Sequence, residues 1–180
     1  MRVNKFFCFL FLCSTSFFSF GKTIVISADT IIERMGEYHG SKNECSPTPY
    51  TFDITSPISD PGDPVYEAVF HNEASRMSVD IRIKNSSSKL DEATLRMDSY
   101  DDFMNKDKHS IYLCAMNSLF NALEPDIPEK KRMALINKII PSMKDDAVSS
   151  AFETNKLAYS IFNGYGGVWF TAEPAYGIIK

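Results

Sequence analysis

Apolar and polar residues alternate most regularly at positions 77–84, which read Met-Ser-Val-Asp-Ile-Arg-Ile-Lys. A period of two places successive side chains on opposite faces, so this segment predicts a strand with one solvent-facing side. A short β-branched run at residues 22–27 predicts a second strand. Residues 29–35 either extend that strand or begin a helix, because their apolar positions also fit helical spacing.

Steps of three and four between apolar positions predict helices in the middle of the chain. The first is expected from Ser88, which can serve as its N-cap, to Met104. The second is expected over residues 110–123, and the third follows Pro128 and stops at Pro141. A short further helical turn is expected at residues 147–152.

The C-terminal part predicts a β-hairpin over residues 156–173. Its two apolar segments flank the turn Asn163-Gly-Tyr-Gly-Gly167, which is rich in residues that tolerate positive φ. Phe170 is expected in the core. The pattern as a whole predicts an α+β fold: an antiparallel sheet of the N-terminal strand, strand 77–84 and the hairpin 156–173, packed against about three central helices. Contiguous helices with strands segregated around them argue against a parallel doubly wound sheet.

Residues 41–64 are expected to be an irregular loop rich in proline. Each proline removes a backbone donor and biases the preceding residue toward extended geometry. A structureless loop of this length in a compact domain is uncommon unless it binds something or is pinned to the surface, and both readings stay open here. The neighbouring residues 65–71 fit neither period clearly.

The N-terminus has the layout of a secretory signal peptide, residues 1–21. Two basic residues, Arg2 and Lys5, precede an uncharged apolar run that ends in Ser19-Phe-Gly21. The run is about 15 residues long, shorter than the roughly 20 that a membrane span needs. A retained anchor and a lipoprotein at Cys13 are the alternatives. We expect cleavage, a periplasmic or secreted protein, and no stable membrane insertion afterwards.

Cleavage would leave residues 22–180 as a single exported domain. Losing Arg2 and Lys5 moves the formal net charge from -4 to -6. An acidic domain is a poor candidate for binding nucleic acid or anionic membranes, because both bind to basic patches. The charge keeps the domain soluble or suits a cationic partner.

Cys45 and Cys114 remain after cleavage, and an oxidising compartment predicts a disulfide between them. The bond would close a loop of about 70 residues and stabilise the fold by roughly 4 kcal/mol in the chain-entropy description. Two buried thiols are the alternative. A Cys-x-x-Cys pair or a Cys–His cluster is absent from the sequence, which argues against a metal or redox site.

The residues that could carry catalysis form no motif. The sequence lacks the Gly-x-Ser-x-Gly and His-Glu-x-x-His patterns. The pairs Glu37-x-His39 and His71-x-Glu73 could each supply two metal ligands, but a zinc site needs three or four. His109 stands apart from both pairs. Catalytic residues therefore stay unknown, and we expect no metal and no cofactor.

Aromatic residues crowd around the hairpin, and three of them are the candidate binding residues: Tyr165, Trp169 and Tyr176. Tryptophan and tyrosine often anchor protein interfaces, although they also fill the cores of small sheets. Tyr165 is expected at the turn tip.

Together these features favour an exported, non-enzymatic domain that binds another protein in the envelope or outside the cell, such as an inhibitor, immunity or envelope accessory protein. One alternative is a small cell-wall hydrolase that uses scattered carboxylates and a histidine. Another is a structural or surface subunit. The sequence leaves the partner and the oligomeric state open.

Overall fold

A computed structural model describes residues 24–41, 51–55, 65–72, 75–84, 89–97, 100–141, 150–164 and 167–175, with the backbone alone considered for residues 51–84 and 106–108. The element order is α1 (Ala28–Gly40), β1 (Thr51–Thr55), β2 (Val65–Asn72), β3 (Ser75–Lys84), β4 (Lys89–Met97), α2 (Tyr100–Met104), α3 (Lys106–Leu123), α4 (Glu129–Ile139), β5 (Ser150–Glu153), β6 (Leu157–Gly164) and β7 (Gly167–Pro174).

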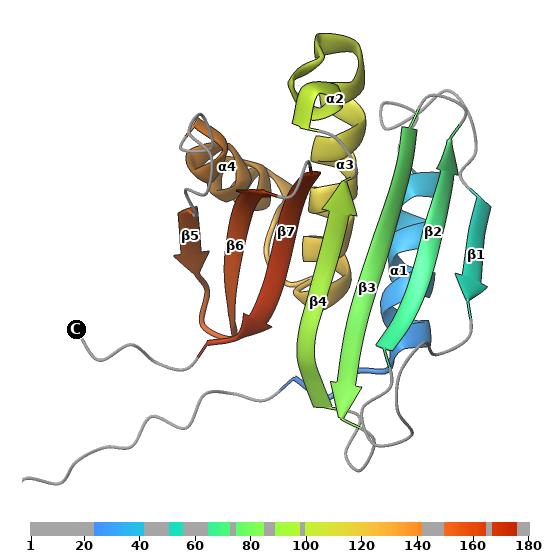
Figure 1. The fold of residues 1–180 in the computed structure, drawn as a ribbon. Coiled ribbons are helices and arrows are strands. Elements are labelled where there is room, and N and C mark those ends of the chain that lie inside the picture. Colours follow the sequence, from blue (N-terminus) through green and yellow to red (C-terminus); the bar gives the residue numbers. More distant parts are fainter. Residues whose placement is uncertain are drawn as a thin grey trace, which may run out of the picture.

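The described strands form one 7-stranded sheet in the order β1-β2-β3-β4-β7-β6-β5. Every neighbouring pair is antiparallel. Helices α1, α3 and α4 lie along one face of this sheet, and α2 lies at one end (Figure 1). The predicted α+β class with an antiparallel sheet is therefore confirmed.

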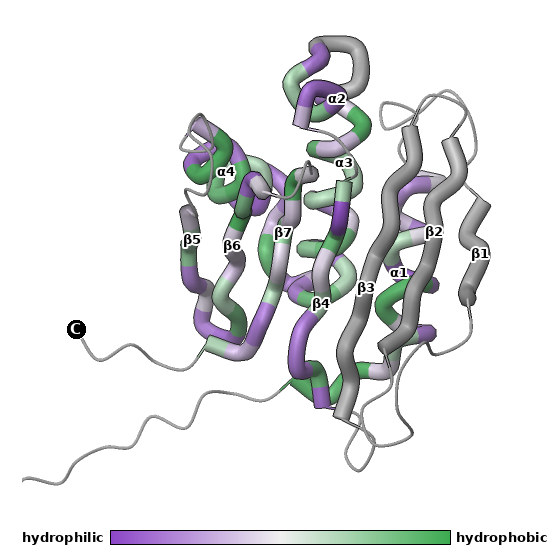
Figure 2. The backbone as a smooth tube through the Cα atoms, in the orientation of Figure 1, coloured by the Kyte–Doolittle hydropathy of each residue, from purple (hydrophilic) through white to green (hydrophobic). Residues whose placement is uncertain are grey.

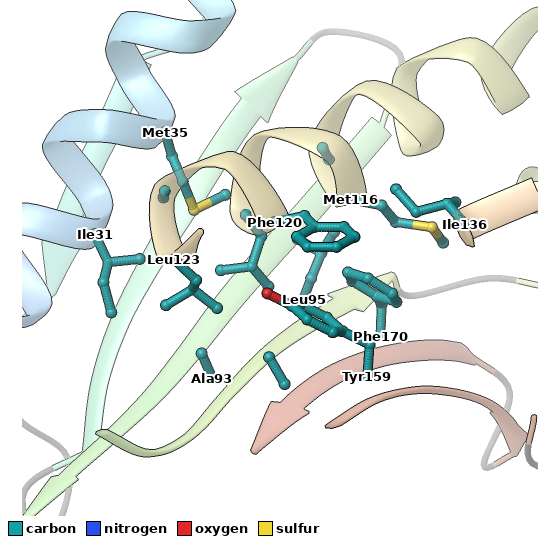
Figure 3. Packing of buried hydrophobic residues seen from close by; sticks show 14 of the residues in the cluster. Ile31, Met35, Ala93, Leu95, Met116, Phe120, Leu123, Ile136, Tyr159 and Phe170 are labelled. Carbon is teal, nitrogen blue, oxygen red and sulfur yellow. The ribbon is translucent and has the colours of Figure 1, made fainter. Parts of the chain in front are cut away.

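Among the residues whose side chains are described, the core lies between this helix layer and strands β4, β7, β6 and β5. Leu95 and Phe170 are fully buried neighbours on β4 and β7, and Phe120 of α3 stacks near Tyr159 of β6 with ring centroids 4.2 Å apart. Figure 3 shows these side chains meeting between the helices and the strands. Their alternate neighbours along β4 and β7 are more polar, as the interleaved colours of Figure 2 show.

Helix α1 begins at a capped end. The Ser27 side chain accepts a hydrogen bond from the backbone N–H of Thr30 at 3.2 Å, which satisfies one of the donors left open at a helix N-terminus. Ile31 and Met35 are fully buried on its inner face, and the helix packs against α3. Residues 29–35 are therefore helical rather than an extension of a strand.

The predicted helix from Ser88 to Met104 is wrong: residues 89–97 form strand β4, and α2 contains only residues 100–104. The β3–β4 register pairs Arg82 with Glu92 but Ile83 with Leu90. Asp91 is thus an extra residue, a β-bulge. The bulge makes Leu90 and Ala93, three positions apart, both buried, and this step imitates helical spacing.

Residues 24–27, the described part of the predicted N-terminal strand, do not form a strand of the sheet. Of the described residues before α1, Val25 makes an isolated bridge with Lys89, and the Leu90 N–H donates to the Ile24 carbonyl at 3.0 Å. The Ser27 cap turns the chain into α1 before a ladder can form. Val25 stays 68% exposed, so its β-branched side chain is not used in the sheet core.

Three further segments form strands that the sequence pattern did not predict. Residues 51–55, inside the expected irregular loop, form edge strand β1 against β2. Residues 65–72, which fit neither period, form β2. Residues 150–153, expected in a helical turn, form edge strand β5 against β6. The edge strands β1 and β5 carry too few residues to establish a period.

The strongest periodic segments are confirmed. Strand β3 covers the predicted 77–84, α3 contains the predicted 110–123, and α4 follows Pro128. The predicted hairpin is β6 and β7, with Gly164 opposite Gly167, and Phe170 lies in the core as expected. None of the helices in these described ranges is both long and apolar enough to cross a bilayer.

Candidate functional site

One face of the sheet carries no helix in the described part of the chain (Figure 1). We call the part of this face formed by β4, β6 and β7 the outer sheet face. Its residues alternate with the buried core residues and are partly or fully exposed, apart from the buried Thr94. They are Glu92, Thr94, Arg96, Ala158, Ser160, Phe162, Trp169, Thr171 and Glu173.

A row of three large side chains crosses the outer sheet face. The register pairs Arg96 with Trp169, and Trp169 with Phe162. Residues opposite one another in an antiparallel pair share a face and lie close together. The Arg96–Trp169–Phe162 row therefore spans β4, β7 and β6.

The Trp169 indole is fixed by two contacts. Its Nε1–H donates to the Gly164 carbonyl at 3.4 Å, and the Arg96 guanidinium carbon lies 5.5 Å from the ring centroid. The second contact is a cation–π interaction, worth about 0.5–1 kcal/mol at an exposed site. These contacts orient the Trp169 indole on the outer sheet face.

Gly164 gives the Phe162 ring room to lie against the backbone. A Cβ at position 164 would come within 2.3 Å of the Phe162 ring, so a side chain there would displace the ring from its place beside Trp169. The glycine of the hairpin thus supports the outer sheet face as well as the turn.

Hydroxyl groups occupy the next row of the outer sheet face. Thr94 and Thr171 lie opposite one another, with their Oγ1 atoms 3.0 Å apart, and the Thr94 hydroxyl also donates to Glu92 at 3.1 Å. This row places hydrogen-bonding groups next to the aromatic row. A flat surface that combines both kinds of group can contact a protein more readily than it can enclose a small ligand.

The sequence-predicted binding residues have different outcomes. Trp169 lies on the outer sheet face, half-buried, whereas Tyr165 and Tyr176 lie outside the described residues. Sequence reasoning missed Arg96 because its segment was assigned to a helix. The alternation of Ala93, Leu95 and Met97 with polar residues was the signal that could have placed Arg96 on a strand.

A pocket of about 510 Å³ lies elsewhere, between the α3–α4 loop, α4 and the β5–β6 turn. We call it the Glu124 pocket. It is lined by Glu124, Asp126, Ile127, Lys131, Leu135, Glu153, Thr154, Asn155 and Lys156.

Glu124 is 3% exposed and connects the end of α3 to the strands. Its Oε2 accepts hydrogen bonds from the Thr154 hydroxyl at 2.8 Å and from the Tyr159 hydroxyl at 3.0 Å. Thr154 Oγ1 in turn accepts from the backbone N–H of Leu157 at 3.0 Å. Glu124 thereby fixes the β5–β6 turn. Sequence reasoning missed this site because its groups are far apart along the chain.

Burial raises the pKa of the Tyr159 hydroxyl well above its ordinary value, and the Glu124 carboxylate raises it further. The hydroxyl therefore stays protonated as a donor to Glu124. Replacing Tyr159 with phenylalanine keeps the ring but removes this donor to a buried charged group. We expect a loss of about 2 kcal/mol in the free energy of unfolding, measured by urea denaturation. A loss below about 0.5 kcal/mol would contradict the hydrogen bond.

The histidines do not join this pocket. His109 of α3 places its Nδ1 2.9 Å from the Phe103 carbonyl, His39 is buried on α1, and neither lines the Glu124 pocket. His71 belongs to β2, where the backbone alone is described. Among the described residues, no three His, Cys, Asp or Glu side chains are grouped as a metal ion would require.

The burial of His39 predicts that the domain becomes less stable at acidic pH. Burial lowers its pKa from 6.5 to about 4, so between these values the unfolded chain binds a proton that the folded chain does not. The stability is fully present above pH 6.5 and falls by about 3 kcal/mol in total as the pH drops to 4. The free energy of unfolding is measured by urea denaturation across this pH range. It is expected to fall less with pH in His39→Phe than in the wild type, and to fall as in the wild type in His109→Gln. An unchanged profile in His39→Phe would refute the assignment.

Cys114 lies half-buried on α3 and is not a free thiol, and Cys45 lies outside the described residues. The pairing of Cys45 with Cys114 therefore stays a prediction.

The described residues thus define an α+β domain with a helix-covered core on one side of the sheet and a polar and aromatic surface on the other. No protein-family model, no curated protein and no solved structure matches the chain.

Proposed function

We propose that the chain is an exported, non-enzymatic domain that recognises another protein through the outer sheet face. The observation that carries this proposal is the Arg96–Trp169–Phe162 row on a face that no described helix covers. Tryptophan and arginine are enriched among residues that dominate binding energies at interfaces. Contacts that already orient Trp169 in the free protein lower the ordering cost of association.

Export and the disulfide belong to the same proposal and are supported by the sequence. The signal-peptide layout of residues 1–21 directs the chain to an oxidising compartment. A bond between Cys45 and Cys114 would then attach residues near the end of α1 to helix α3. Peptide mapping without reduction should yield a linked pair of peptides that contain these two cysteines, and two separately alkylated peptides would contradict the bond.

The test of the proposal is affinity capture by the oxidised domain, from Lys22 onward, in envelope and secreted fractions. We expect one protein in stoichiometric amount, identified by mass spectrometry. The same capture with Trp169→Ala should lose that protein, because the variant removes the centre of the row. A partner retained equally by Trp169→Ala would contradict the outer sheet face as the binding site.

A small hydrolase is the second candidate, and the Glu124 pocket is the observation that favours it. A buried carboxylate next to a tyrosine is the kind of pair that acid–base chemistry uses. The Thr154 hydroxyl, however, lies 3.0 Å and 2.8 Å from the two Glu124 oxygens and shares its one hydrogen with them, which fits a role in fixing the β5–β6 turn. Turnover of cell-wall fragments by the wild type, abolished in Glu124→Gln, would favour the enzyme over the binding domain.

A further inference from the structure

Glu124 brings a negative charge to the wall of a pocket, and among the described residues no cation donates a hydrogen bond to its carboxylate. Its hydrogen bonds all come from the neutral hydroxyls of Thr154 and Tyr159. Within the described residues, Glu124 forms no ion pair with a lysine or arginine. A buried charge is costly unless it is paired or well hydrogen-bonded, so an incoming cation would gain more here than at an exposed carboxylate.

The cations nearest to this wall are largely engaged elsewhere. Arg132 is buried and lies near enough to oppose the rise in the pKa of the Tyr159 hydroxyl, but its hydrogen bonds go to the Asn117 Oδ1 at 2.8 Å and to the Ile127 carbonyl. Lys156 lies 3.7 Å from Asp126 at the exposed rim. Lys131 also lines the pocket, and its flexible side chain can compete for the same carboxylate.

We infer that the Glu124 pocket binds the amino or guanidinium group of a ligand. The pocket volume of about 510 Å³ falls in the range of small-molecule sites. A slim alkyl chain that ends in a cation can pass the apolar Ile127 and Leu135 and place its charge beside Glu124. The ligand is either a lysine or arginine side chain of a protein partner or a free small amine. The inference is independent of the outer sheet face, because the two sites are built from different residues.

The first experiment titrates the isotopically labelled, oxidised domain with ethylguanidinium and follows its backbone amide resonances. We expect saturable shifts at Glu124, Thr154 and Lys156, with a Kd of about 1 mM for so small a ligand. Propionamide, which has a similar shape but no charge, should give no saturable shift. Shifts of equal size with both probes, or with neither, would overturn the inference.

Variants separate the charge from the shape of the pocket. Glu124→Gln keeps a carbonyl acceptor for Thr154 and Tyr159 but removes the charge. It should raise the Kd for ethylguanidinium at least tenfold. Glu153→Gln removes an exposed carboxylate of the same pocket and should change the Kd less than about twofold. If Glu124→Gln does not fold, Lys131→Gln provides the test, because loss of the competing cation should tighten binding. Unchanged affinity in the informative variant would refute the inference.

Two further probes distinguish the sources of the cation. Acetyl-arginine methylamide reproduces an arginine side chain of a protein, and spermidine represents a free polyamine. Tighter binding of the blocked arginine assigns the pocket to a partner's side chain, and tighter binding of spermidine assigns it to a free amine. A failure of both probes to displace ethylguanidinium would overturn the assignment to either source.

Discussion

Phe170→Ala is expected to destabilise the domain by about 4 kcal/mol, within the range found when a buried phenylalanine is truncated. Phe170 is fully buried, pairs with Leu95 on one side and Ile161 on the other, and has its ring 5.8 Å from that of Tyr159. Truncation removes buried apolar surface and leaves a cavity in the core between the sheet and the helices. Urea denaturation of the oxidised protein, monitored by circular dichroism, measures the change.

Trp169→Ala is the matched control for this experiment, because it truncates an aromatic residue on the same strand but on the opposite face. Trp169 is half-buried and contacts Arg96 and the Gly164 carbonyl, so its loss should cost about 1 kcal/mol. A Phe170→Ala loss no larger than that of Trp169→Ala would mean that the assignment of the two faces is reversed.

The second large effect is on binding. Once the partner has been identified, Trp169→Ala should weaken its affinity at least about 30-fold, which corresponds to about 2 kcal/mol. The expected cause is the loss of the largest rigid side chain in the Arg96–Trp169–Phe162 row. Isothermal titration calorimetry with purified partner measures the Kd, and the folded state of the variant is checked by its unfolding curve.

Thr171→Ala is the control for the binding experiment. Thr171 is next to the row on the outer sheet face and contributes a hydroxyl that pairs with Thr94. Its truncation should weaken binding by less than about fivefold, since residues around the energetic centre of an interface contribute little individually. A larger effect for Thr171→Ala than for Trp169→Ala would move the centre of binding away from the aromatic row.

The sequence predicted the elements whose hydrophobic period is long and uninterrupted. Strand β3, helices α3 and α4, and the hairpin of β6 and β7 all fall into this group. It misassigned β4, where the bulge at Asp91 changes the phase of the alternation. It also missed β1 and β5, because edge strands of five and four residues are defined by pairing rather than by their own pattern.

For the candidate sites too, the residues predicted were those in segments with a clear local period, and the residues missed depend on pairing or on distant contacts. Trp169 was predicted because the hairpin was assigned correctly, and the alternation along β7 separated it from Phe170. Arg96 could not be placed beside Trp169 without the β4–β7 register. The Glu124 pocket depends on contacts between residues about 30 positions apart in the chain, for which local spacing gives no signal.

We expect the outer sheet face to contact another protein. The most direct test is photo-crosslinking in cells with a photoreactive residue in place of Glu173, which is exposed at the edge of that face. One crosslinked protein is expected from this position. No such product is expected when the photoreactive residue replaces Lys138, which is exposed on α4 in the helix layer. A crosslink from position 138 without one from position 173 would contradict the claim and place recognition on the helices.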